Sequence, residues 1–152
     1  MEIGRSLRLA RILRPGTGRT VIIAIDHGNY AGAMKGIENP RGAVEAAVRG
    51  GADAVIVNIG TLRKVYRDLA GRVGIILRLD GGHTLLHPDK TPSSTLTTTV
   101  AEAATKAGGA GVAFGRNVWQ SNNPIGMVKA LVRIVHEGKS APEASLQLRD
   151  TR

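Results

Sequence analysis

One stretch of this chain constrains its fold more than any other: the apolar run that begins at Val21 and leads into Asp26, His27 and Gly28. Continuous apolar runs of this length are typical of a strand buried on both faces, as in a parallel sheet. Asp26 and His27 then stand at the carboxyl end of the strand, where Gly28 allows a sharp turn. Because that edge carries the chemistry in barrels and open α/β sheets, Asp26 is a candidate catalytic residue. The alternative is that Asp26 only caps the following turn.

Three further apolar runs follow the first, at residues 52–58, 73–79 and 110–114. Helical patterns separate these runs, and strands that alternate with helices form parallel sheets with helical crossovers. The sequence therefore predicts an α/β fold of four β-α units. A complete (β/α)8 barrel needs about 250 residues, so a chain of 152 residues has room for about half of one.

Capping residues indicate where the helices begin and end. Asn39 and Pro40 are typical of a helix start, and Gly50 with Gly51 is typical of a helix end. Asn123 and Pro124 indicate a last long helix in the same way. The other expected helices are 3–14, one from a cap at Thr61 to residue 69, 100–107 with a capping box of Thr99 and Glu102, and a short helix after a second box of Ser140 and Glu143.

The formal charge of +9 favours anionic partners such as phosphorylated metabolites, nucleic acid or acidic lipid. Nucleic acid is the less favoured partner, because aromatic residues, which would stack on bases, make up only 3% of the chain and are scattered. The absence of cysteine excludes disulfides and thiolate metal sites. No leader or membrane-inserting segment is recognisable, so we expect a cytoplasmic protein with no membrane partner.

Five segments carry a family resemblance. They resemble, in the same order, the archaeal-type class I fructose-bisphosphate aldolases, whose relatives include an aminodideoxyheptulosonate synthase and a phospho-autoinducer thiolase. The resemblance implies a partial (β/α)8 TIM barrel, a half-barrel parallel sheet with outer helices. It also implies Schiff-base aldol cleavage of phosphorylated ketoses such as fructose 1,6-bisphosphate, with no cofactor. The segments are 22–28, 36–41, 50–55, 77–82 and 111–118.

The resemblance also implies roles for individual residues. Asp26 matches the aspartate that handles protons at the end of the family's first strand, and Gly115 with Arg116 matches its last phosphate-binding loop. His27, Asp80 and Lys35 are further candidates. His27 is alternatively a local hydrogen-bonding residue, and Asp80 either orients substrate hydroxyls or caps the turn at Gly81. Lys35, in the first β-α loop, is a candidate substitute nucleophile.

A metal site is not expected. His83 and His87 are four residues apart with Asp89 nearby, a spacing that raises the question of a metal ligand set. Pro88 and the surrounding loop disfavour a rigid site of that kind.

The chain departs from the family's pattern near Gly108 to Gly111, where it passes from the third β-α unit to the family's eighth strand. The resemblance then implies that strands four to seven are missing, and with them the Schiff-base lysine and the proton-shuttling tyrosine. We therefore expect a phosphosugar-binding protein that has lost cleavage activity. The alternatives are an active aldolase and, less favoured, a basic nucleic-acid-binding protein.

We expect one truncated domain over residues 1–152. Its expected parts are an N-terminal helix (1–14), the first three β-α units (20–107), the last unit (110–138) and a C-terminal helix and tail (139–152).

Two sheet orders compete for the fourth strand. The family order 4-1-2-3 requires a left-handed crossover, which is rare, so we predict the order 1-2-3-4. Either sheet has two open edges, and open edges favour association. We therefore expect the chain to be a homo-oligomer or to be poorly stable. In the order 1-2-3-4, strand four of one copy would abut strand one of the other, which would bring Arg116 and Asp26 together in trans.

Overall fold

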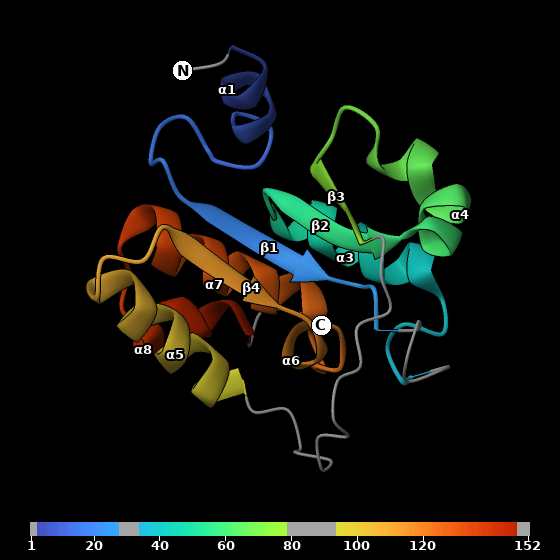
Figure 1. The fold of residues 1–152 in the computed structure, drawn as a ribbon. Helices are drawn as coiled ribbons and strands as arrows, with labels where there is room; N and C mark the ends of the chain where they lie inside the picture. Colours follow the sequence, from blue (N-terminus) through green and yellow to red (C-terminus); the bar gives the residue numbers. More distant parts are fainter. Residues whose placement is uncertain (1–2, 28–33, 79–93, 149–152) are drawn as a thin grey trace.

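Four parallel strands form one sheet in the computed structural model, which describes residues 3–27, 34–78 and 94–148. The order of the strands across the sheet is β3-β2-β1-β4 (Figure 1). The predicted α/β half-barrel of four β-α units is confirmed. The strands are β1 (Thr20–Ala24), β2 (Ala54–Asn58), β3 (Gly74–Arg78) and β4 (Gly111–Phe114).

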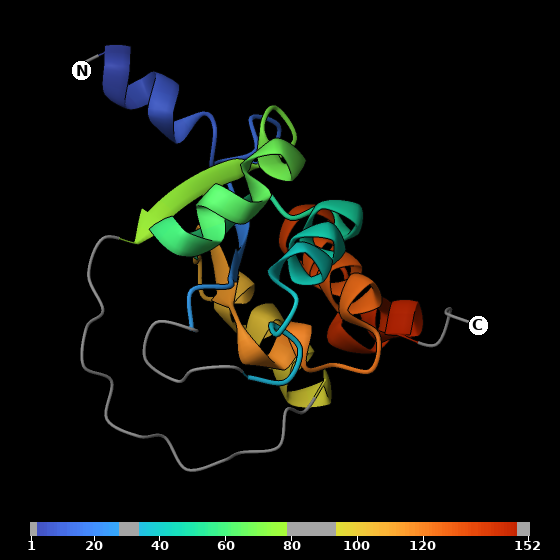
Figure 2. The same ribbon diagram turned by 90° about the vertical axis from the view of Figure 1, so that its right-hand side faces the viewer.

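Helices cover one face of this sheet, and α7 is the longest of those in the described residues. Figure 1 shows α7 and α3 behind the strands, and Figure 2 shows the helical layer beside the sheet from the side. The helices are α1 (Ile3–Leu9), α3 (Pro40–Gly50), α4 (Ile59–Leu69), α5 (Ser94–Lys106), α6 (Arg116–Trp119), α7 (Pro124–Glu137) and α8 (Ala141–Ser145), followed by a 3-10 turn, Leu146–Leu148.

The core lies between the sheet and these helices. In the two central strands, β1 and β2, the residues that face the helices, such as Val21, Ile23 and Val55, are fully buried. Residues of the opposite face, such as Ile22 and Ile56, are only half-buried. None of the described helices covers that second face, which in a closed barrel would point to the lumen (Figure 1).

The predicted strand order 1-2-3-4 is wrong, because β4 pairs with β1. The connection from β3 to β4 returns across the sheet with α5 on the same side as α7, which makes this crossover the rare left-handed kind. Packing of α7 explains the outcome, since this helix lies against α3 and β1. At Gly50, where a Cβ atom would clash with Val128, the two helices come into close contact. A fourth strand beyond β3 would have taken α7 away from α3.

Local capping confirms some of the predicted helix boundaries. The Asn39 side chain accepts a hydrogen bond from the Arg41 N–H (3.2 Å), and the Asn123 side chain accepts one from the Gly126 N–H (2.8 Å). The capping box of Ser140 and Glu143 is also present at α8.

Other boundaries differ from the prediction. The cap of α4 is Asn58, which accepts a bond from the Thr61 N–H (2.7 Å), so the helix begins three residues earlier than a cap at Thr61 predicts. Helix α5 begins at Ser94, and Glu102 accepts a hydrogen bond from the Ala141 N–H (2.6 Å) instead of closing a capping box. Helix α1 ends at Leu9, short of the predicted residue 14. In the parts of the chain that the structure describes, no helix combines the length and apolar character that crossing a membrane requires.

Candidate active site at the carboxyl edge of the sheet

A buried ion pair lies at the carboxyl ends of β1 and β3. The Arg78 Nη1 atom donates to Asp26 Oδ2 at 2.6 Å, and the Asp26 side chain is only 4% exposed. Arg78 is the last residue of β3, and Asp26 lies two residues beyond the end of β1. Both are in the register that faces away from the helices. Between them, β2 ends in Asn58, whose side chain is turned to the Thr61 N–H. The pair therefore spans one strand on the open face of the sheet.

His27 lies beside this pair and is held by an aromatic neighbour from the far end of the chain. Its Nδ1 atom is 3.5 Å from Asp26 Oδ1, and its ring meets that of Trp119 edge to face, with the centroids 5.4 Å apart. Trp119 is itself fixed, because its Nε1–H donates to the Ala24 carbonyl at 3.0 Å. Burial lowers the pKa of His27 below its usual 6.5; the Asp26 charge opposes this shift, while the charges of Arg116 and Arg78 add to it. His27 is therefore a neutral imidazole at neutral pH.

Gly115 is in close contact with the His27 ring. A Cβ atom on Gly115 would lie 2.5 Å from His27 Cε1 and 3.1 Å from the Ala24 carbonyl oxygen. Real Cβ atoms do not approach other atoms so closely, so a side chain at this position would displace the imidazole. The absence of a side chain at residue 115 thus allows the loop after β4 to close over the end of β1.

Arg116 follows as the first residue of α6 and is half-buried. Among the residues that the structure describes, its guanidinium has no hydrogen-bond or ion-pair partner. Its charge nevertheless acts on His27. A guanidinium fork without an acidic partner suits the geometry of phosphate or carboxylate oxygens.

The structure brings Asp26 and Arg116 together within one chain, since β1 and β4 are neighbours. The predicted arrangement in trans between two copies is therefore wrong. It depended on a strand order that the packing of α7 rules out.

Lys35 is exposed, and its carbonyl oxygen accepts a hydrogen bond from the Gln120 side chain at 3.1 Å, just after α6. Its backbone thus lies near the site, whereas the side chain is in solvent. The other lysines of the described chain lie on helices or in the turn after α7 and never in a strand. Asp80 and the histidines at 83 and 87 lie outside the described residues, as does Lys90.

Sequence reasoning missed two residues of this arrangement, Arg78 and Trp119. Arg78 had a signal, because a charged residue that ends an apolar strand faces the same edge as Asp26. Trp119 had none, since helix α6 is too short to leave a periodic pattern.

The assembled groups define what the site is able to do. A buried carboxylate is held by one guanidinium, a neutral imidazole can give or take a proton, and a second guanidinium is available to an anion. In the described residues no three His, Asp or Glu side chains are grouped so as to hold a metal ion. An amine nucleophile is also absent from the described part of the site.

A parallel α/β half-barrel with polar groups at the carboxyl edge is the arrangement of barrel-type enzymes. Residues 20–97 match a family model described as DeoC/LacD family aldolase. The chain belongs to this aldolase family.

Curated relatives agree with this assignment. The chain is 36% identical over 86 residues to the 3-hydroxy-5-phosphonooxypentane-2,4-dione thiolases of Yersinia pestis (strain Pestoides F) and Yersinia pseudotuberculosis serotype O:1b (strain IP 31758). These matches cover 57% of this chain and 29% of each thiolase, so the chain spans less than a third of their length.

A solved structure confirms the fold. A crystal structure of an archaeal fructose 1,6-bisphosphate aldolase matches with a TM-score of 0.62 and 16% sequence identity, over 88% of this chain and 99% of that one. The resemblance drawn from the five sequence segments is thus confirmed as family and fold.

Proposed function

We propose that this protein binds a phosphorylated ketose, of the fructose 1,6-bisphosphate type, at the carboxyl edge of its sheet and does not cleave it. The observation that carries the proposal is the meeting of Asp26, Arg78, His27 and Arg116 at one edge, with one guanidinium still available. Arg116 and the loop at Gly115 would hold the phosphate, while Asp26 and His27 would contact hydroxyl or carbonyl oxygens of the sugar.

The proposed loss of cleavage follows from the chemistry of the family. A Schiff base needs a deprotonated lysine amine, which requires burial or a cationic neighbour. Lys35, the lysine whose backbone lies near the site, is exposed. Asp26 would still be oriented by Arg78, but it would have no covalent intermediate on which to act.

The placement of β4 supports the proposal that an internal part of the ancestral barrel is missing. In a closed barrel the first and last strands are neighbours, and β4 pairs with β1 in that way. A complete barrel of the family would have four more β-α units between β3 and β4. By the resemblance, those units hold the Schiff-base lysine and the proton-shuttling tyrosine. Residues 1–152 would then form one truncated barrel domain.

The open edges support a further part of the proposal, that two copies associate. Ile75 and Leu77 on the edge strand β3 are 40% and 37% exposed. Closure of two half-barrels about a two-fold axis along the barrel would set β3 of each copy against β4 of the other. All eight strands would then be parallel, and the apolar open face would be buried.

The alternative is an active aldolase in which Lys35 has become the nucleophile. Borohydride trapping with dihydroxyacetone phosphate, read by intact mass and peptide mapping, separates the two. We expect no covalent adduct, and calorimetry should detect reversible binding of the same ligand. A stoichiometric adduct on Lys35 would instead establish the enzyme.

Substitution of Arg116 tests whether the ligand binds at the proposed site. We expect Arg116→Gln to weaken binding of dihydroxyacetone phosphate about tenfold, because a charge-assisted hydrogen bond is removed. Arg63→Gln, on the exposed side of α4, removes the same charge away from the site and serves as the control. Equal losses in both variants would show that only net charge attracts the ligand.

A further inference from the structure

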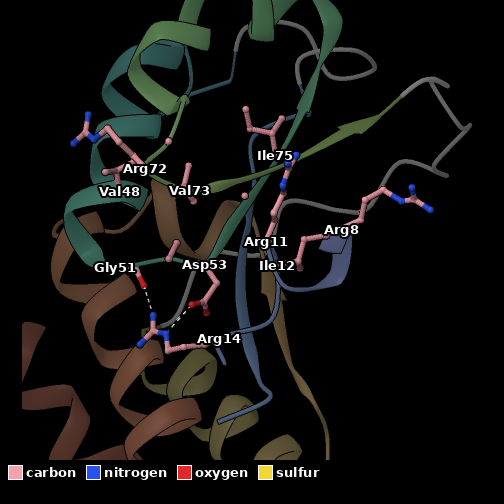
Figure 3. Close-up of a pocket in the computed structure, with 13 residues that line it drawn as sticks. Arg8, Arg11, Ile12, Arg14, Val48, Gly51, Asp53, Arg72, Val73 and Ile75 are labelled. Atoms are coloured by element: carbon pink, nitrogen blue, oxygen red, sulfur yellow. Dashed lines mark hydrogen bonds and ion pairs between the residues drawn. The ribbon is translucent and has the colours of Figure 1, made fainter. Parts of the chain in front are cut away.

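A second site candidate lies at the opposite, amino-terminal edge of the sheet. There a cavity of about 1010 Å³ opens between the N-terminal segment and the turn before β3 (Figure 3). Four arginines line it, together with apolar side chains such as Ile12, Val73 and Ile75. The arginines are Arg8, Arg11, Arg14 and Arg72.

The acidic residue in the lining, Asp53, already accepts three hydrogen bonds from the protein. Its carboxylate accepts from Arg14 Nε at 2.8 Å, from the Val21 N–H at 2.7 Å and from His136 Nε2 at 2.8 Å. Arg14 also donates to the Gly51 carbonyl at 2.9 Å. These contacts fix one wall of the cavity and neutralise Arg14.

The other three arginines keep their charge uncompensated. Arg8, Arg11 and Arg72 are exposed. Within the described chain they form no ion pair with an acid; Arg72 donates to the Asp68 carbonyl at 3.2 Å. Four arginines against one aspartate leave an excess of three positive charges around one concave surface. Such a surface concentrates anions.

The geometry favours an anion with several charges. In Figure 3, Arg8 and Arg72 lie on opposite sides of the cavity and point away from it. Rotation of these long, exposed side chains would bring a guanidinium to a ligand from each side. A single phosphate would engage one such guanidinium fork, whereas a chain of phosphates presents oxygens to all three. None of the lining residues is aromatic, so a nucleic-acid strand would find no stacking platform here.

We propose that this cavity binds the polyphosphate group of a small molecule, either free or carried as an ester. The site is separate from the phosphosugar site. It lies at the amino ends of strands of five residues, about 16 Å along the strand from the edge that holds Asp26 and Arg78. The proposal does not rest on the function proposed for that edge.

Calorimetry of the full chain with inorganic tripolyphosphate tests the proposal, with ATP as the esterified form. We expect saturable binding of one tripolyphosphate per chain, and at least tenfold weaker binding of orthophosphate. Arg8→Gln, Arg11→Gln and Arg72→Gln should each weaken tripolyphosphate binding about fivefold, as expected for an exposed charge-assisted contact. Comparable affinity for ATP indicates an esterified ligand, and exclusion of ATP indicates a free polyphosphate.

The matched controls are Arg5→Gln on α1 and Arg63→Gln on α4, which remove a charge without altering the cavity lining. Each should change the affinity for tripolyphosphate less than twofold. Thermal melts of all variants check that they are folded, and binding of dihydroxyacetone phosphate should be unchanged in Arg8→Gln.

Three results would overturn the proposal. One is the absence of saturable binding by the folded protein. Another is a loss in Arg5→Gln or Arg63→Gln as large as in the cavity variants, since binding would then follow net charge. The third is displacement of tripolyphosphate by a single-stranded 20-nucleotide DNA of equal or higher affinity, which would indicate a nucleic-acid surface instead.

Discussion

The ion pair between Asp26 and Arg78 is the part of the site whose energetics can be worked out most directly. Its two side chains are 4% and 27% exposed, and the N–O distance is 2.6 Å. Breaking a buried pair by removing one partner destabilises proteins by about 3–5 kcal/mol, whereas exposed pairs contribute about 0.2–1 kcal/mol. Because a quarter of Arg78 is in contact with water, we expect a coupling energy of about 2 kcal/mol.

A double-mutant cycle of Asp26→Asn and Arg78→Gln measures this coupling energy. The free energy of unfolding of the wild type, both single variants and the double variant is obtained from urea titrations followed by far-UV circular dichroism. Equal m-values across the four proteins are needed for the comparison. The cycle cancels other contacts that each residue makes alone.

The pair of Glu45 and Arg49 on α3 provides the control. These side chains are 59% and 61% exposed and lie one helical turn apart at 3.4 Å, so their coupling should be about 0.3–0.5 kcal/mol. If Asp26 and Arg78 couple no more strongly than this surface pair, solvent screens the site. Arg78 then does not hold Asp26 in place, and the proposed binding geometry fails.

Three further predictions concern Gly36, His27 and the open edges of the sheet. Gly36→Ala should lower the free energy of unfolding by about 2–4 kcal/mol in urea titrations, because residue 36 has φ +95° and a Cβ would clash with the Trp119 carbonyl. Gly71→Ala is the control, with φ +73° and open space around it, and should lower it by only about 1 kcal/mol. Equal losses in the two variants would show that the clash with Trp119 does not contribute. Burial lowers the pKa of His27 in the folded state, so the unfolded state binds more protons; this contribution to stability is complete above about pH 6.5 and should be lost as the pH falls. Urea midpoints measured between pH 5 and 7 should therefore rise with pH, and less steeply in His27→Gln. The same pH dependence in this variant would assign the effect to another group. Light scattering after size exclusion should give a dimer mass for the proposed closed pair, and a monodisperse monomer that melts cooperatively would contradict it.

The sequence predicted the strands well, because each one is a short apolar run bounded by glycine or a charged residue. The run from Val21 to Asp26 and the run that ends at Arg78 needed no tertiary information. Helix starts were predicted wherever a cap and a proline coincide, as at Asn123. The start of α4 was missed because its cap, Asn58, is also the last residue of the preceding strand β2.

The strand order escaped prediction for a physical reason. Crossover handedness is a general preference, while the order here goes with specific packing of α7 against α3 and β1, including the close contact at Gly50 and Val128. The same limit applies to the site. Asp26 and Arg116 were identifiable as residues that follow strands, but their nearness within one chain depends on β4 lying beside β1.

The pairing of β1 with β4 affects folding during translation. The paired residues Thr20 and Gly111 are 111 − 20 = 91 positions apart, and contacts of such long sequence separation slow folding. At translation rates of about 5–20 residues per second, roughly 5–18 s separate the synthesis of the two strands. During that interval β1 has a free edge, and its buried side chains lack the cover that α7 later gives. We therefore expect the nascent chain to depend on chaperones until α7 has left the ribosome.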